Sequence, residues 1–328
     1  MPLELASLLD RRLVIVTGKG GTGKTTVAGA LALAAAGAGR RVLVVEVGPE
    51  ENVPPLLVPG PQPVRVGYEG RELRKGLRAM RIDPYEALAE YLGLQIGLRG
   101  VVRRVLANRA FRQLMDAAPG WRELITLGKI WHLEQARDAG APRFDLVVVD
   151  APATGHGLTF LDVPRVVGSA VRAGPLRRHA GWVEALIRDR ERTLLLPVAL
   201  AEELPARETT ELVARLRQSV GVSVDRIVVN AVTREPFPPG AADLDARLAR
   251  LPADLAIPGA PPPAVLAACA AHLRGRCALN GRWAREIAAS TGLPVVLLPR
   301  LARGVHGPDE LAELAAALLA RRPLAGAA

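Results

Sequence analysis

Residues 18–25 read Gly-Lys-Gly-Gly-Thr-Gly-Lys-Thr and decide the fold of this chain. The apolar run at 13–17 predicts a buried strand before them, and the alanine-rich sequence from Lys24 onward predicts a helix after them. A loop of this pattern between a strand and a helix cradles phosphates with its backbone N–H groups and the helix N-terminus. Lys24 is expected to reach the β- and γ-phosphates, and Thr25 to ligate Mg²⁺. The predicted nucleotide-binding residues of the loop are Gly18, Gly20, Gly21, Thr22, Gly23, Lys24, Thr25 and Thr26.

Repeated strand and helix patterns predict one parallel sheet. The helix predicted at 24–36 is ended by glycines, and residues 41–47 repeat the buried-strand pattern, which gives a right-handed βαβ crossover. We therefore expect an α/β fold, a doubly wound and mainly parallel sheet of the P-loop NTPase type with a helical insertion. The remaining strands are predicted at 144–150, 193–199, 226–230 and 293–299.

The whole chain, residues 1–328, is predicted to form a single P-loop ATPase domain. Apolar residues at helical spacing predict a helical subdomain inserted at 83–140 and at about 160–192. Six prolines between positions 49 and 63 predict a loop without regular structure. Residues 309–320 predict an amphipathic helix that packs on the core and not on a membrane surface.

Composition limits the classes of protein that remain. The chain has 43 Lys and Arg against 33 Asp and Glu, a net charge of +10 that suits either a polyanion partner or an arginine-rich soluble surface. Two cysteines exclude a disulfide framework and a four-thiolate zinc site. A continuous apolar run of membrane-spanning length is absent from the sequence, and residues 1–12 do not resemble a secretion signal. We expect a cytoplasmic protein.

Lys19 departs from an ordinary P-loop, because a side chain directly after the first glycine projects outward from its own phosphate cradle. The loop resembles the deviant K-G-G-x-G-K-T-T loop of dimeric ATPases, in which this lysine crosses into the nucleotide site of the partner. The resemblance implies a homodimer with nucleotide at the interface, and it implies that Lys19 supplies positive charge to the phosphates in trans. The alternative is a solvated loop lysine.

Asp150 ends the strand predicted at 144–150, at the edge where open α/β sheets bind ligands. Its carboxylate is expected to face the magnesium shell, through a water molecule. The turn-forming residues that follow predict a switch loop that enters no helix before Leu158. His156 in this loop is expected to make an orienting hydrogen bond more readily than to act as a general base.

The segment Asp-Ala-Pro-Ala-Thr-Gly-His at 150–156, with 158–161 after it, resembles the switch II signature of the arsenical-pump and tail-anchored-protein-targeting ATPase family. The resemblance covers nearly the whole chain. It implies an ATP-hydrolysing, magnesium-dependent switch that couples hydrolysis to conformational change and handles an unknown protein client. It also implies adenine contacts at Asn230 and Pro299. The further matching segments are residues 82–91, 119–124, 228–230 and 298–304.

Gly48 stands where the family carries an aspartate that positions the attacking water. Glu46 at the strand end or Glu50 in the loop are the candidates that bring a carboxylate to the γ-phosphate, and the alternatives are a strand-end surface charge and a solvated loop charge. A nucleotide-binding scaffold with weak catalysis is the rival function that Gly48 suggests. The predicted catalytic residues are Lys19, Lys24, Glu46 and Asp150, and the predicted metal ligands are Thr25 and, through water, Asp150.

Features of specialised clients are missing from the sequence. Cys269 and Cys277 are interpreted as buried small residues of a helix, so neither arsenite transport nor a zinc-bridged dimer is expected. Few methionines and aromatic residues also argue against tail-anchored-protein targeting. A second rival function is a partition-type ATPase whose basic surface binds DNA or a membrane. The switch ATPase is favoured over this function. The residues that could form this surface are the arginines at 71, 74, 78 and 81 with Lys75, and the arginines at 99, 103, 104, 109 and 112. The first four arginines also have the spacing of a solvated helical stripe.

Overall fold

The structure is a computed structural model that describes residues 6–96, 99–117, 120–234, 237, 243–252, 255 and 258–319. Within these residues, eight strands form one sheet in the order β10-β9-β8-β1-β7-β2-β4-β3. All neighbours run parallel except the edge strand β3, so the predicted α/β fold class is confirmed. The strands of this sheet are β1 (Leu13–Thr17), β2 (Val42–Val47), β3 (Arg71–Arg74), β4 (Leu77–Ile82), β7 (Leu146–Asp150), β8 (Thr193–Leu200), β9 (Ile227–Val232) and β10 (Val295–Pro299). A separate ribbon pairs β5 (Arg137–Asp138) with β6 (Ala141–Pro142).

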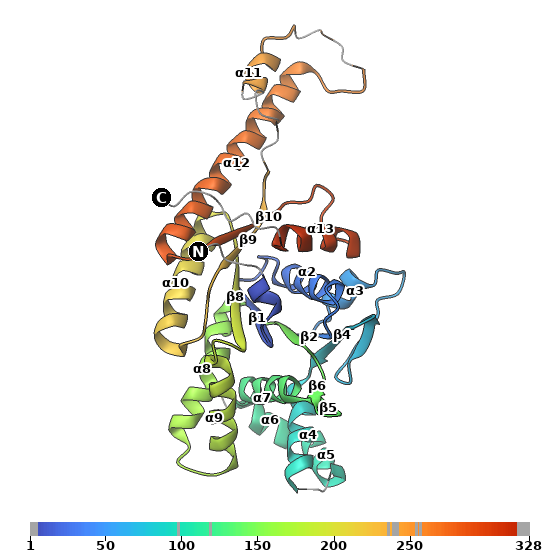
Figure 1. Cartoon of the computed structure of the whole chain (residues 1–328), viewed down its shortest axis with the longest axis vertical. Helices are drawn as coiled ribbons and strands as arrows, with labels where there is room; N and C mark the ends of the chain where they lie inside the picture. Colours follow the sequence, from blue (N-terminus) through green and yellow to red (C-terminus); the bar gives the residue numbers. More distant parts are fainter. Residues whose placement is uncertain are drawn as a thin grey trace.

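Helices cover both faces of the sheet (Figure 1). One face carries α2 (Lys24–Gly37), α3 (Val53–Leu57) and α13 (Pro308–Leu319), which pack on one another. Side chains alternate along a strand, so Val14 of the central strand β1 is buried on this face while its neighbour Ile15 is buried on the other. The predicted C-terminal helix is confirmed as α13, whose leucines join the same core as α2.

The opposite face carries a group of helices that we call the helical body, drawn in cyan and green in Figure 1. Its two parts are far apart in the sequence, but α7 packs against α4 on one side and against α8 and α9 on the other. This body occupies the place of the predicted helical subdomain, whose limits at 83–140 and about 160–192 stay predictions. The helical body consists of α4 (Pro84–Ile96), α5 (Arg99–Ala107), α6 (Arg109–Ala117), α7 (Trp121–Gln135), α8 (Thr154–Ala170) and α9 (Pro175–Arg188).

A long helix, α12 (Pro263–Thr291), extends beyond the sheet with α11 (Leu244–Leu248) packed near its outer end (Figure 1). Its inner part packs against α10 (Glu203–Arg215), which continues into a short π-helix (Leu216–Val220). Cys269 on α12 is exposed and Cys277 half-buried, so the predicted burial is wrong for Cys269. The outer part of α12, beyond the sheet, packs against α11. The short helix α1 (Ala6–Leu9) precedes β1.

The arginines at 71, 74, 78 and 81 lie on two strands, so the predicted helical stripe is wrong. β3 and β4 form an antiparallel hairpin, and β4 also pairs in parallel with β2. The three-to-four residue spacing of the arginines imitates a helix, whereas the buried residues Leu77 and Ala79 follow the two-residue period of a strand. Pairing with β2, more than thirty residues earlier in the chain, settles the choice.

Two boundary predictions are also wrong. The proline-rich stretch 49–63 contains the short helix α3, with Pro54 in its first turn. A proline is tolerated there because the backbone N–H groups of the first turn have no partner within the helix. Helix α8 begins at Thr154, four residues before the predicted earliest start, and its residues Phe160 and Leu161 bury their side chains in the core on the side of the helical body. None of the helices in the described residues combines the length and the apolar character that a membrane span requires.

Candidate nucleotide-binding site

The glycine-rich loop joins β1 to α2 at the edge of the sheet where the parallel strands end. Gly23 directly precedes α2 with φ of 88°, and a Cβ atom there would lie 2.2 Å from Nδ2 of Asn230. Asn230 on β9 donates from this nitrogen to the carbonyl of Thr22 at 3.0 Å. The asparagine predicted at the adenine side therefore braces the loop, and only glycine at position 23 leaves room for it.

Lys24, Thr25 and Asp150 meet at the start of α2. The Thr25 hydroxyl donates to Oδ2 of Asp150 at 2.6 Å, while Oδ1 is buried and has no hydrogen-bond partner among the described residues. Burial raises the pKa of Asp150, opposed by the Thr25 hydrogen bond and the Lys24 charge. Burial lowers the pKa of Lys24, opposed by the charge of Asp150. A carboxylate oxygen without a partner, beside a threonine hydroxyl, fits a magnesium ion, which prefers oxygen ligands.

Glu46 lies next to Asp150 because β2 and β7 are neighbours and pair these two residues in register. One carboxylate oxygen of Glu46 accepts from the backbone N–H groups of Asn52 at 2.6 Å and Val53 at 2.8 Å. The other oxygen is buried without a hydrogen-bond partner in the described part of the chain. Burial is the main cause that raises the pKa of Glu46 to about 7. A buried carboxyl group that titrates near neutrality can accept a proton at physiological pH.

These residues share one wall of a chamber of about 870 Å³ at the edge of the sheet. Gly48, where an aspartate was expected, also lines it, and a Cβ atom there would meet nothing within 4 Å. The chamber is also lined by Arg122, Glu123 and Thr126 of α7, for which no functional role was predicted. They occupy neighbouring positions on one side of a helix, a pattern that an ordinary amphipathic surface helix also shows.

Lys19 points away from the phosphate cradle of its own chain. Its ammonium group pairs with Glu208 on α10, and its side chain stays 46% exposed. The second carboxylate oxygen of Glu208 is buried without a partner among the described residues. Within the loop, the backbone carbonyl of Lys19 accepts hydrogen bonds from the Lys24 ammonium at 3.0 Å and from the Thr22 hydroxyl at 2.9 Å. The side chains of the two loop lysines therefore have different partners. The sequence offered no signal for Glu208, which is one of 33 acidic residues.

The other predicted residues lie at the same edge or outside the described side chains. Thr26 lies in the first turn of α2, and Pro299 ends β10 in register with Val232 of β9. Pro299 is buried, so an adenine contact there stays a prediction. His156 belongs to the first turn of α8, but its side chain lies outside the described residues, so neither of its predicted roles is tested.

The central strand, the loop and the strand-end aspartate have the arrangement of a P-loop nucleotide-binding protein. The chain belongs to the anion-transporting ATPase family, whose model matches residues 11–178. It is 36% identical over 223 residues to ATPase BagA of Mycobacterium tuberculosis, a match that covers 67% of this chain and 64% of that protein.

Two other relatives extend the comparison. The chain is 29% identical over 266 residues to an arsenical pump-driving ATPase of Escherichia coli, which covers 73% of this chain and 44% of that protein. It is 25% identical over 359 residues to ATPase GET3 of Malassezia globosa, which covers 97% and 95% of the two chains. The similarity therefore includes relatives with different named roles, and the family alone does not select one client.

Proposed function

We propose that this chain is a magnesium-dependent ATPase that hydrolyses ATP to ADP and phosphate as a homodimer. The reaction moves the helical body and thereby acts on a protein client. The observation that carries the proposal is the hydrogen bond between Thr25 and Asp150 beside Lys24, at a chamber large enough for phosphates and water. Family membership supports hydrolysis, since the relatives named above are called ATPases.

Each residue of the site has a separate chemical task in this proposal. Lys24 and the N-terminus of α2 neutralise the phosphates. Thr25 and Asp150 hold the magnesium ion, which supplies positive charge to the phosphate oxygens when bound. Glu46 orients the attacking water and takes its proton, replacing the aspartate that the family carries at position 48.

Lys19 is the residue for which the dimer matters. Its ammonium group lies against Glu208 of α10 and not against Lys24's cradle, so it has no phosphate to neutralise within its own chain. In a symmetric dimer that brings two loops face to face, each Lys19 leaves Glu208 and enters the partner's site. A partly exposed ion pair such as this one contributes little stability, so breaking it costs little free energy.

The helical body is connected to the phosphates through two helices. α8 starts four residues after Asp150, and α7 lines the same chamber as Lys24. Loss of the γ-phosphate removes its contacts with the start of α8 and with the part of α7 that lines the chamber. Nucleotide switches release a segment in this way. The client is then a protein that contacts the helical body in one nucleotide state.

Thr25→Ala should raise the magnesium concentration needed for half-maximal ATP hydrolysis by about 10- to 50-fold, because the hydroxyl is one of few protein ligands that hold the ion. The measurement is phosphate release across a magnesium titration, together with binding of a fluorescent ATP analogue. Thr210→Ala on α10, whose hydroxyl donates only to the Ala206 carbonyl of its own helix, is the control for loss of a threonine hydroxyl outside the site. Equal hydrolysis by the wild type with and without magnesium contradicts the proposal, as does absence of nucleotide binding.

Gly48→Asp should increase kcat at least about tenfold, because it adds a carboxylate at the position where the chamber has open space. Gly48→Asn has nearly the same shape without the charge and should leave kcat within about twofold. Single-turnover phosphate release separates the chemical step from product release. A wild-type rate near zero that Gly48→Asp does not raise would favour a nucleotide-binding scaffold over an ATPase.

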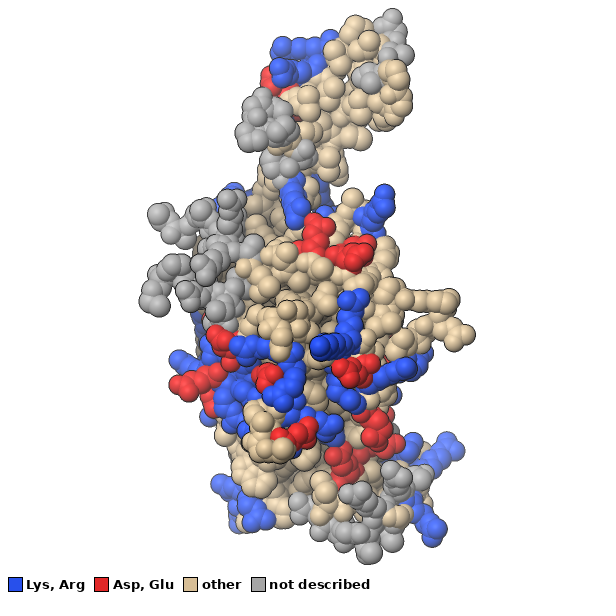
Figure 2. Space-filling view, turned by 45° about the vertical axis from the view of Figure 1, so that its right-hand side comes forward, with Lys and Arg blue, Asp and Glu red and all other residues tan. Residues whose placement is uncertain are grey.

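The rival with a DNA- or membrane-binding basic surface has less support. Arg74 donates to the Leu57 carbonyl at 3.1 Å, Arg78 donates to the Gly70 carbonyl at 3.2 Å, and Arg81 pairs with Glu51 at 3.7 Å. These three of the nine arginines that suggested a patch therefore bond to groups of the protein itself. Figure 2 shows acidic and basic side chains interspersed over the lower half of the visible face, whereas a phosphate-binding surface gathers one sign of charge.

A further inference from the structure

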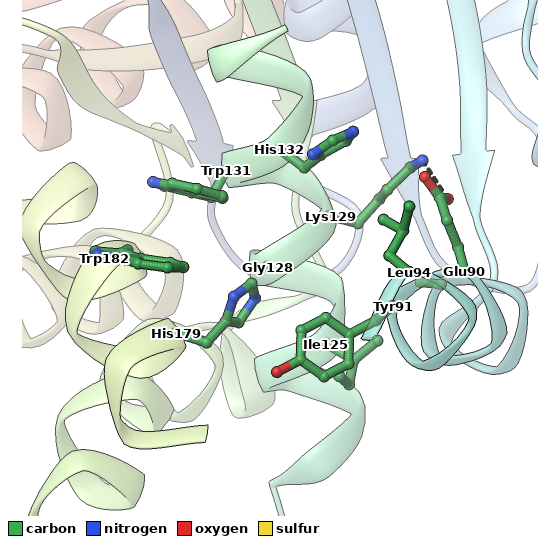
Figure 3. A pocket seen from close by; sticks show the side chains of 11 residues that line it. Glu90, Tyr91, Leu94, Ile125, Gly128, Lys129, Trp131, His132, His179 and Trp182 are labelled. Carbon is green, nitrogen blue, oxygen red and sulfur yellow. Dashed lines mark hydrogen bonds and ion pairs between the residues drawn. The ribbon is translucent and has the colours of Figure 1, made fainter. Parts of the chain in front are cut away.

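A second cavity lies inside the helical body, away from the P-loop. It encloses about 150 Å³ between α4, α7 and α9. Figure 3 shows that Tyr91 of α4 and His179 of α9 approach each other across Gly128 of α7, so the middle helix forms the floor. A cavity of this size holds one small ring system, as apolar protein cavities of similar volume do.

Aromatic rings form one wall of this cavity. Trp131 and Trp182 stack with ring centroids 5.2 Å apart and planes 11° apart. His179 lies edge-on to Trp131 at 5.8 Å and tilted against Tyr91 at 5.1 Å. The chain has only 4 Trp and 3 Tyr, so three of these seven rings gather around one small cavity. Such walls favour flat aromatic ligands, which pack edge-to-face or offset against protein rings.

His179 gives the cavity a hydrogen-bonding group. It is 8% exposed and lines the cavity. A Cβ atom at position 128 would lie 2.2 Å from its Nε2, so glycine there lets the imidazole lie directly on the backbone of α7. Glycine within a helix lowers stability by about 0.5–1 kcal/mol relative to alanine. The close approach of the His179 ring explains why glycine stands at position 128.

The charged groups of the cavity neutralise one another. Lys129 donates to Glu90 at 2.6 Å, and the hydroxyl of Tyr68 donates to the same carboxylate oxygen. Burial and the neighbouring His132 lower the pKa of His179, which keeps the imidazole neutral with one donor and one acceptor. No net charge remains among these groups to attract an ion. The occupant that fits is therefore uncharged.

We propose that this cavity binds a small uncharged aromatic molecule of one or two fused rings that carries a hydrogen-bonding group. Its ring packs against Trp131 and Tyr91, and its polar group bonds His179. Trp182, which is 50% exposed, and Leu94, which is 59% exposed, form the mouth through which it enters. A bound peptide helix inserts several side chains into a row of pockets, whereas this cavity accommodates one ring system.

The cavity shares one helix with the candidate nucleotide site. Thr126 of α7 lines the same chamber as Lys24, and Gly128 two residues later lines the aromatic cavity. A ligand that fixes α7 therefore changes the affinity for nucleotide, and nucleotide changes the affinity for the ligand by the same factor. This coupling rests on the proposed ATPase function, whereas binding in the aromatic cavity does not.

The probe is 5-fluoroindole, followed by ¹⁹F line broadening and shift on the full chain without nucleotide. We expect a Kd of about 0.1–1 mM, which is ordinary for a ligand of about ten heavy atoms. Gly128→Ala and Trp182→Ala should each weaken binding at least about tenfold, since the first displaces His179 from its place on α7 and the second removes the outer wall. Trp182 is half exposed, so its replacement keeps the test valid if Gly128→Ala fails to fold.

Trp283→Ala, on α12 and outside the cavity, is the control for loss of a tryptophan and should bind like the wild type. His179→Phe keeps a flat ring and should remove the preference for 5-fluoroindole over 5-fluorobenzothiophene, which lacks the N–H donor. Lys24→Ala should bind the probe unchanged, so failure of the ATPase proposal leaves this result intact. Absence of binding up to about 5 mM, or equal binding by the Trp182→Ala variant, overturns the proposal. Binding of an apolar helical peptide in place of the probe also overturns it.

Discussion

Lys19→Ala should lower kcat for ATP hydrolysis about a thousandfold while the affinity for ATP changes by less than about threefold. The reason is geometric. The Lys19 ammonium lies against Glu208, and the proposed dimer assigns it to the partner's nucleotide and not to the phosphate cradle of its own chain. Charge delivered to the transferring phosphate in the transition state raises kcat, whereas Lys24 acts on the bound ground state as well.

Mixed dimers provide the sharpest measurement of this effect. A Lys19→Ala chain binds ATP but lacks the lysine for its partner, and a Lys24→Ala chain has Lys19 but an impaired phosphate cradle. Mixing the two inactive variants should restore hydrolysis, because one working site then forms in each mixed dimer. Lys75→Ala, in the exposed turn of the β3–β4 hairpin, is the matched control and should behave like the wild type. A full loss in Lys19→Ala that mixing does not repair would assign Lys19 to its own site.

Glu46→Gln should reduce kcat/KM about a hundred- to thousandfold above pH 7. The variant keeps an oxygen that accepts from the N–H groups of Asn52 and Val53, so the loop after β2 retains its support. It loses only the ability to take a proton. Glu50→Gln, in the exposed loop of the same chamber, is the matched control. Loss of activity in that control and not in Glu46→Gln would move the catalytic carboxylate to Glu50.

The pH dependence distinguishes a catalytic from a structural role for Glu46. With a pKa of about 7, the carboxyl group is protonated and inactive at low pH, so kcat/KM of the wild type should rise roughly tenfold from pH 6 to pH 8. Glu46→Gln should lack this rise. A profile that is flat for the wild type over this range would contradict the assignment.

Stability should change in the opposite direction. The folded pKa of about 7 lies above the ordinary value of 4.5, so the folded state binds more protons than the unfolded state between these pH values. Ionisation of Glu46 therefore lowers the free energy of unfolding as pH rises through this window. Glu46→Gln should unfold with about 1–3 kcal/mol more free energy at pH 8 in chemical denaturation. Higher stability together with lower activity in Glu46→Gln would indicate that Glu46 is retained for catalysis and not for stability.

Local sequence determined the parts of this protein that depend on neighbours in the chain. The strand at 13–17, the glycine loop and the helix from Lys24 are one continuous segment, so their order alone predicts a phosphate cradle with Lys24 and Thr25 at its end. Asp150 also followed from its place at the end of an apolar strand, because parallel strands end at one edge. The hairpin β3–β4 was missed, since its arginine spacing imitates a helix and its pairing partner β2 lies elsewhere in the chain.

Only the tertiary structure decided which residues that are far apart in the sequence lie close together in the fold. Glu46 meets Asp150 because β2 lies next to β7, and burial in that position raises its pKa to about 7. Lys19 meets Glu208 across the sheet edge, 189 residues later in the chain. The aromatic cavity forms because α7 carries Gly128 beneath a histidine from α9. Sequence patterns report the period of a helix or strand, whereas burial, pKa and the contents of a cavity depend on side chains that only the packed fold brings together.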